Sequence, residues 1–141
     1  ILGLDGAQKM SKSRSNAIML RATEDETAAL IKKAKTDADR TITYDPENRP
    51  EVSNLLLMIS LCTGREPAQV AAGIGDGGAG TLKKMLTETL NEYLRPLRKR
   101  RAVLESNLDH VRQVLRDGIA EARRVGGKTL EEVIDVMNMG I

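Results

Sequence analysis

The chain has 141 residues, which is about the size of one domain and enough to bury a substantial core. Phe and Trp are absent and Tyr44 and Tyr93 are the only tyrosines, so the core must be built from aliphatic side chains. The 22 Lys and Arg residues nearly balance the 20 Asp and Glu residues, which excludes a uniformly basic nucleic-acid-binding surface. Any basic site must therefore be local.

Cysteine content and hydropathy limit the class of protein further. Cys62 is the only cysteine, so the chain forms no internal disulfide, and its apolar neighbours predict a buried thiol. No segment approaches the roughly 20 consecutive apolar residues of a membrane span, and we expect a cytoplasmic protein with no membrane partner. The chain begins with Ile1 rather than Met. We therefore expect an internal piece of a longer protein.

Residues 1–22 are expected to hold the end of a strand followed by a loop. Gly3 and Gly6 free the backbone, and the pentapeptide Lys-Met-Ser-Lys-Ser follows at residues 9–13. Two lysines and two hydroxyls on such a loop can surround a polyphosphate and stabilise the charge that develops on a departing pyrophosphate. The glycines and polar side chains predict a poorly packed loop. The alternative is a surface Lys/Ser segment that only aids solubility.

The remaining pattern is helical, and it predicts an all-α fold, a bundle of five to six helices. Thr23 and Glu26 have capping-box spacing, Pro50 and Pro67 suit first helical positions, and Pro96 is expected to kink a long helix. Gly126 and Gly127 are expected to end one helix, before a second capping box starts the last. The expected helices cover roughly residues 23–35, 50–63, 67–72, 82–104, 106–125 and 129–137.

Two further patterns are not expected to be sites. Residues 73–80 spell G-x-G-x-x-G twice, but a helix precedes them and no strand–loop–helix unit surrounds them, so they predict a helix connection rather than a dinucleotide site. His110 is the only histidine and offers neither a metal cluster nor a visible catalytic triad. We therefore expect no metal ligands in this chain and an exposed His110.

Basic residues concentrate late in the chain. On two antiparallel helices they would form one cationic surface of the kind that binds a phosphate backbone. The alternative is that these cations only complement a helix dipole and aid solubility. The candidates for RNA contact are Arg95, Arg98, Lys99, Arg100, Arg101, Arg112 and Arg116.

The pentapeptide at residues 9–13 also resembles, letter for letter, the signature loop of class I aminoacyl-tRNA synthetases. Three blocks resemble, in order and over nearly the whole chain, those of bacterial tryptophanyl-tRNA synthetases. They are GLDGAQKMSKSRSNAI, YDPENRPEVSNLLLMISLCTGREP and GTLKKMLTETLNEYLRPLRKRR. Tyrosyl-tRNA synthetases are the alternative, but they usually vary the signature loop.

The resemblance implies the C-terminal part of such a synthetase, from the signature loop onward. Residues 1–22 would end the catalytic Rossmann domain, and residues 23–141 would form the helical anticodon-binding domain. The nucleotide-binding part, with its HIGH-type motif and tryptophan pocket, would be missing. We therefore expect this chain alone to be inactive.

The resemblance also implies the reaction and its residues. The full enzyme activates tryptophan with ATP and Mg²⁺ to tryptophanyl-adenylate and transfers it to tRNA(Trp). Lys9 and Lys12 would be catalytic and hold the ATP phosphates. Met10, Ser11 and Ser13 would shape the loop, and Ile1 would lie near the adenine.

The same resemblance implies the partners. ATP with Mg²⁺ enters as substrate, and no bound metal or cofactor is expected in this chain. Tryptophan and ATP would bind through the missing catalytic domain, and the family is homodimeric largely through that part. Two other readings remain open, a standalone helical RNA-binding module and a helical protein-interaction module.

Overall fold

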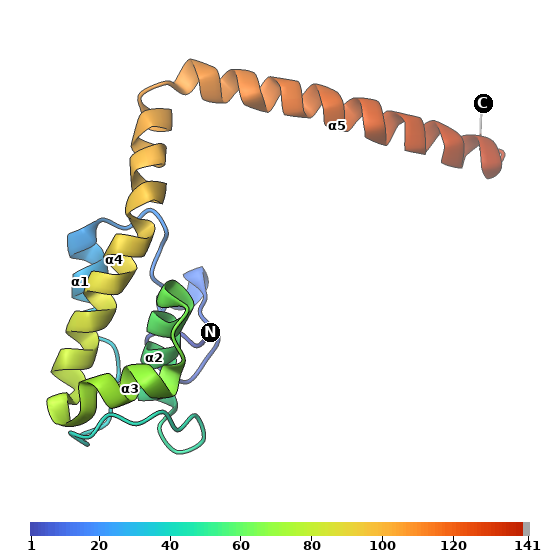
Figure 1. The fold of residues 1–141 in the computed structure, drawn as a ribbon. Helices are drawn as coiled ribbons and strands as arrows, with labels where there is room; N and C mark the ends of the chain where they lie inside the picture. Colours follow the sequence, from blue (N-terminus) through green and yellow to red (C-terminus); the bar gives the residue numbers. More distant parts are fainter. Residues whose placement is uncertain (140–141) are drawn as a thin grey trace. The chain divides into compact units, whose positions relative to one another are not determined.

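The computed structural model describes residues 1–139 and divides into two compact units, Ile1–Arg98 and the segment from Lys99 onward. Regular structure within the described residues is helical, which confirms the all-α prediction (Figure 1). The predicted strand end is only a single antiparallel bridge between Leu2 and Lys9. Residues 1–22 belong to the first compact unit, and residues 140 and 141 of the predicted helical domain lie outside the described part.

The first three helices begin where local chemistry predicts. The first ends at Lys32, before the expected residue 35, and the third continues to Ile74, beyond the expected residue 72. Helix α1 (Glu24–Lys32) starts at a capping box in which Thr23 Oγ1 accepts from the Glu26 amide and the Glu26 carboxylate accepts from the Thr23 amide. Helix α2 (Pro50–Thr63) has a proline at its first position and ends at Gly64, whose φ of 72° is left-handed. Helix α3 (Pro67–Ile74) also starts at a proline.

The glycine cluster joins two helices, as predicted. A short 3₁₀ turn, η2 (Gly75–Gly77), follows α3, and helix α4 (Gly78–Glu105) begins directly after it. Gly75 and Gly78 have φ values of 52° and 71°, which glycine adopts without strain. Helix α4 continues through Pro96.

The core of the first unit is aliphatic. It is formed by the inward faces of α1, α2, α3 and α4, with contributions from the loops before α1 and α2. Its most deeply buried side chains are Ile31, Val52, Leu55, Leu56, Ile59, Val70, Leu82 and Leu86. Cys62 is half-buried and packs against this core, and burial raises the pKa of its thiol, so it is not a reactive thiolate.

The end of the chain differs from the prediction. Helix α5 (Leu108–Val136) is continuous where two helices were expected, at residues 106–125 and 129–137, so the predicted break between them is wrong. Gly126 and Gly127 do not adopt positive φ, and each costs a helix only about 1 kcal/mol, which is too little to end it. Thr129 does not cap a helix either, since its hydroxyl donates to the Val125 carbonyl at 3.2 Å.

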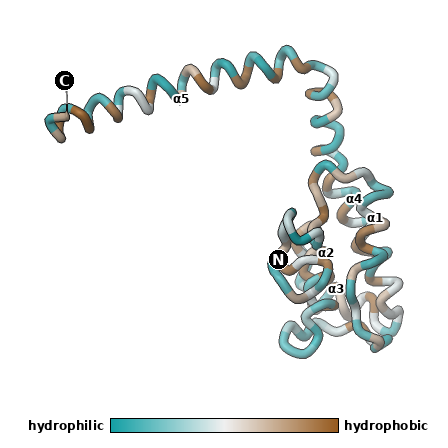
Figure 2. The backbone as a smooth tube through the Cα atoms, turned by 180° about the vertical axis from the view of Figure 1, so that it is seen from behind, coloured by the Kyte–Doolittle hydropathy of each residue, from teal (hydrophilic) through white to brown (hydrophobic). Residues whose placement is uncertain are grey.

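The start of α5 was predicted one residue too early. The N-cap is Asn107, whose side chain accepts from the His110 amide at 3.2 Å, rather than Ser106. His110 is exposed, as predicted. Apolar and polar residues alternate along α5 (Figure 2), and none of its residues is buried.

Candidate functional site

The signature pentapeptide lies on a hydrogen-bonded loop, residues 1–16, which we call the signature loop. Around the Leu2–Lys9 bridge, the Gly3 amide donates to the Gln8 carbonyl at 2.7 Å and the Met10 amide donates to the Ile1 carbonyl at 3.2 Å. Residues Lys12–Arg14 then form one 3₁₀ turn. Ser15, at φ 53°, turns the chain back toward the start of the loop.

Helix α2 holds the base of the loop through Asn54. This side chain is only 5% exposed. Its Oδ1 accepts from the Leu2 amide at 3.0 Å, and its Nδ2 donates to the carbonyls of Leu2 and Gly3 at 3.1 and 3.2 Å. One amide side chain therefore pairs with the loop backbone as a neighbouring strand would.

Asn16 holds the loop from inside. It is also 5% exposed, and its Oδ1 accepts from the Ser11 amide at 2.8 Å. Its Nδ2 donates to Asp5 Oδ2 at 2.8 Å and to the Lys9 carbonyl at 3.5 Å. The Asn16 carbonyl accepts from the Leu4 amide at 2.9 Å, so the end of the loop is tied to its beginning.

Asp5 extends this network along the loop. Its Oδ1 accepts from the amides of Ala7 and Gln8 at 3.1 and 3.3 Å. The hydrogen bond from Asn16, followed by the Ala7 amide, holds the pKa of the Asp5 carboxyl below its ordinary value. Asp5 is therefore a carboxylate at neutral pH and can only accept hydrogen bonds.

Two loop glycines are required by close packing. A Cβ atom at Gly3 would overlap the Asn16 side chain, and one at Gly6 would overlap Glu51. Gly6 also has a φ of 68°, which disfavours any other residue. Gly3, Leu4, Gly6 and Asn16 are buried, so the base of the loop is closely packed. Residues 7–9 and 12–15 are exposed, so the part that carries both lysines is open to solvent.

The pentapeptide separates apolar from charged side chains. Met10 packs against the core and lines an apolar cavity of about 250 Å³ together with Ile1, Met58 and Tyr93. Lys9, Lys12 and Ser13 are exposed, and the hydroxyls of Ser11 and Ser13 lie 3.0 Å apart. The loop therefore presents both ammonium groups to solvent while Met10 anchors it.

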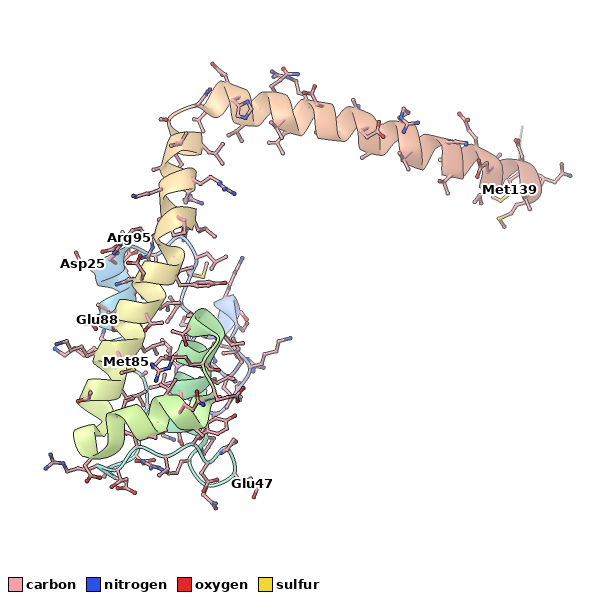
Figure 3. All side chains as sticks on the ribbon, viewed as in Figure 1. Asp25, Glu47, Met85, Glu88, Arg95 and Met139 are labelled. Carbon is pink, nitrogen blue, oxygen red and sulfur yellow. The ribbon has the colours of Figure 1, made fainter. Side chains whose placement is uncertain are left out.

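The seven candidate RNA-binding residues lie on α4 and α5. Arg95, labelled in Figure 3, pairs with Glu92 at 2.6 Å, and Arg101 pairs with Glu105 at 2.6 Å. Lys99 and Arg100 are exposed. On α5, Arg112 pairs with Asp109 at 3.0 Å and Arg116 donates to Gln113 at 2.7 Å, all within one helical turn. These exposed pairs are weak and leave the cations accessible.

Arg98 differs from the other six. Its Nε donates to the Ala22 carbonyl at 2.9 Å, and its Nη1 donates to Asn91 Oδ1 at 2.9 Å. Its Nη2 donates to Thr27 Oγ1 at 2.9 Å and to the Thr23 carbonyl at 3.5 Å. Its guanidinium therefore joins α4 to the start of α1.

Sequence reasoning missed Asn54, Asn16 and Asp5 as parts of this site. Asn54 could have been suspected, because it is a polar residue beside Val52, Leu55 and Leu56 on a helix with a buried face, and a buried polar residue is informative. Asn16 and Asp5 gave no such signal. Their roles depend on a loop closure that has no sequence periodicity.

The described residues 1–139 offer neither a metal cluster nor a membrane-spanning helix. No three or more His, Cys, Asp or Glu side chains in this range come together in a way that could hold a metal ion. No helix in the same range is both long and apolar enough to cross a membrane.

The comparisons with known proteins indicate the same family as the pentapeptide of the signature loop. The family described as tRNA synthetases class I (W and Y) matches residues 1–95, more than half of the chain. The chain belongs to this family. The tryptophan–tRNA ligase of Gloeobacter violaceus is 37% identical over 138 residues, which cover 96% of this chain and 41% of that protein. The Nostoc enzyme of the same name is 36% identical over 132 residues, covering 92% of this chain and 39% of that protein.

Solved structures of the family have the same fold. The tryptophanyl-tRNA synthetase of Mycoplasma pneumoniae matches with a TM-score of 0.76 and 25% identity, over 99% of this chain and 45% of that one. The Campylobacter jejuni enzyme, complexed with ADP and tryptophan, matches with a TM-score of 0.74 and 26% identity, over 96% of this chain and 42% of that one. This class I synthetase chain therefore spans less than half the length of its relatives.

Proposed function

We propose that this chain is the C-terminal part of a tryptophan–tRNA ligase, from the signature loop onward. The complete enzyme activates tryptophan with ATP and Mg²⁺ to tryptophanyl-adenylate and transfers the tryptophan to tRNA(Trp). Residues 1–22 complete the catalytic domain and the helices that follow contact the anticodon of the tRNA. The names of the relatives, and their coverage of nearly all of this chain, support this assignment.

One observation carries the role of the loop. Lys9 and Lys12 are exposed at the surface of a loop whose backbone is held by buried asparagines. Two cations on a fixed backbone can bind the triphosphate and stabilise the charge that grows on the pyrophosphate as its bond to the α-phosphate breaks. Because the lysines act on charge that develops in the reaction, they accelerate adenylate formation more than they tighten substrate binding.

Basic residues of α4 and α5 support the contact with tRNA. Lys99, Arg100 and Arg101 on α4, and Arg112 and Arg116 on α5, are exposed or only paired within their own helix. Arginine suits an RNA partner because its planar group binds phosphate and stacks on unpaired bases. Arg95 joins them, and Arg98 contributes charge although its donors bond within the chain.

Three parts of the assignment remain predictions. Tryptophan and the adenine of ATP bind mainly through the catalytic part outside this chain, with Ile1 close to the adenine. The complete enzyme is a homodimer, and it works in the cytoplasm.

The test replaces Lys12 in the full-length synthetase. Lys12→Ala is expected to slow tryptophan-dependent ATP–pyrophosphate exchange by about a hundredfold to a thousandfold, as loss of one charge-stabilising donor does. Tryptophan affinity, measured by calorimetry, is expected to change little. Lys84→Ala removes an exposed lysine of α4 outside the loop and is expected to leave exchange unchanged.

Two outcomes contradict the proposed function. Equal losses in exchange rate and in tryptophan affinity would show that Lys12 acts on the ground state rather than on the transition state. Exchange above background by the isolated 141-residue chain would show that the site is complete without the catalytic part.

A further inference from the structure

The backbone of the signature pentapeptide converges on one side-chain amide, that of Asn16. The amide contacts the Lys9 carbonyl and the Ser11 amide, which are the backbone groups on either side of Met10. Lys9 carries the first of these two groups on its own backbone, and Lys12 directly follows the second. The amide therefore fixes the part of the backbone that sets the spacing between the two cations.

The hydrogen-bond chemistry of this position requires an asparagine. The Ser11 amide needs an acceptor, and the Asp5 carboxylate needs a donor, so one group must offer both within a few ångströms. Aspartate at position 16 has no donor for Asp5 and brings a second negative charge beside it. Glutamine adds a methylene where the side chain already packs against the Gly3 backbone.

The network continues beyond the pentapeptide through Asp5. The carboxylate accepts from Asn16 on one oxygen and from the amides of Ala7 and Gln8 on the other. The loop from residue 5 to residue 16 is thus closed by one donor–acceptor pair, in which Asn16 is buried and Asp5 is half-buried. Hydrogen bonds to a charged group are stronger than neutral ones, so this pair holds the loop more firmly than its backbone contacts alone.

We propose that Asn16, held by Asp5, is a positioning residue that sets the geometry of Lys9 and Lys12 for the triphosphate of ATP. This role rests on the proposed function of the loop. Asn16 touches no reacting atom and acts only through the lysines. A displacement of about 1 Å at a catalytic group can cost on the order of a hundredfold in rate. The buried Asn16 amide therefore affects the reaction rate although it does not contact the reacting atoms.

The first experiment measures Asn16→Ala in the full-length synthetase. The kcat of tryptophan-dependent ATP–pyrophosphate exchange is expected to fall by about tenfold to a hundredfold, with tryptophan affinity unchanged. Asn91→Ala is the matched control, since Asn91 also donates and accepts, to Glu24 and from Arg98, but lies outside the loop. Its kcat is expected to stay at the wild-type value. Equal losses of kcat in both variants would overturn the positioning role.

A double-mutant cycle separates positioning from a purely structural role. If Asn16 acts through the lysines, Asn16→Ala slows exchange much less in a Lys12→Ala background than in the wild type. Equal slowing in both backgrounds overturns the inference and leaves the proposed function standing. If Lys12→Ala itself has no effect on exchange, the proposed function fails first.

A swap of the two partners covers the case in which Asn16→Ala does not fold. Asn16→Asp alone places two carboxylates together and is expected to lose as much activity as Asn16→Ala. The double variant Asp5→Asn with Asn16→Asp restores one donor between the two side chains and keeps an acceptor for Ser11. Asp at position 16 has no donor for the Lys9 carbonyl, so the double variant tests the bonds to Asp5 and Ser11. Recovery of most of the exchange rate supports the Asp5–Asn16 pair, and no recovery overturns the role of Asp5 in holding Asn16.

Discussion

The two compact units hold their side chains in place by different means. In the first, buried aliphatic residues form a core, and side-chain hydrogen bonds join segments that are distant in sequence, as between Asn54 and Leu2 or between Arg98 and Ala22. In α5, no residue is buried, and the side-chain ion pairs join residues three or four apart, as in Arg124 with Glu121. The lysines proposed to act on ATP belong to the unit whose geometry depends on tertiary contacts.

This difference suits the two proposed tasks. Charge stabilisation in a transition state requires cations at fixed positions, because reorganisation during the reaction would cancel the gain. Contact with an RNA backbone depends mainly on the number of cations and on salt, so it tolerates side chains fixed only by a helix. The signature loop is therefore built with buried polar partners, and the basic residues of α5 are not.

The largest expected contrast is between apolar residues of the two units. Leu86 is fully buried and Leu115 is 60% exposed. Leu86→Ala is expected to lower the free energy of unfolding by about 2–5 kcal/mol, because it removes buried surface and leaves a cavity. Leu115→Ala is expected to change it by less than about 0.5 kcal/mol. Urea unfolding followed by circular dichroism measures both, and equal losses would show that α5 has a buried face.

Arginines of α4 give a contrast of intermediate size. Arg98→Ala removes the partner of the buried Ala22 and Thr27 acceptors and is expected to lower the free energy of unfolding by about 1–3 kcal/mol. Arg98→Lys is expected to recover little, since an ammonium cannot replace the planar fork. The exposed Arg100 is the matched control, and its replacement by Ala is expected to change stability by less than about 0.5 kcal/mol.

The same two variants separate stability from RNA binding. In the full-length synthetase, Arg100→Ala is expected to reduce the slope of tRNA affinity against salt by about one, as loss of one phosphate contact does. Arg98→Ala is expected to lower stability because the guanidinium bonds to α1. If this variant weakens tRNA binding with no loss of stability, the hydrogen bonds from Arg98 to α1 do not stabilise the fold.

Local chemistry predicted the starts of the first three helices and the class of fold. Thr23 and Glu26, Pro50, Pro67 and the left-handed Gly64 act within a few residues of themselves, so their effect can be read from the sequence alone. The same reasoning failed at Gly126 and Gly127. Glycine ends a helix only where the chain turns into positive φ, and nothing in the neighbouring sequence shows whether it will.

The sequence predicted the lysines of the site but not the side chains that hold their loop in place. The pentapeptide identifies Lys9 and Lys12 by its spelling, whereas the supports come from Asn54 on α2 and from an Asp5–Asn16 pair that spans 11 positions. Such contacts form only when the loop closes, so no local pattern encodes them. For the same reason, the loop was expected to be poorly packed, although its glycines serve close packing against Asn16 and Glu51.

Glycine substitutions in the two units give the smallest expected contrast in stability. Their effects have opposite signs, since one variant is stabilised and the other is destabilised. Gly127 lies inside α5 without positive φ and with open space where a Cβ would be, so Gly127→Ala is expected to stabilise the helix by about 1 kcal/mol. Gly6 has a left-handed φ of 68° and contacts Glu51, so Gly6→Ala is expected to destabilise the loop by about 1–2 kcal/mol. Amide hydrogen exchange resolves the two sites separately. Slower exchange in both variants would mean that Gly6 does not need its left-handed conformation, and that the loop can close in another way.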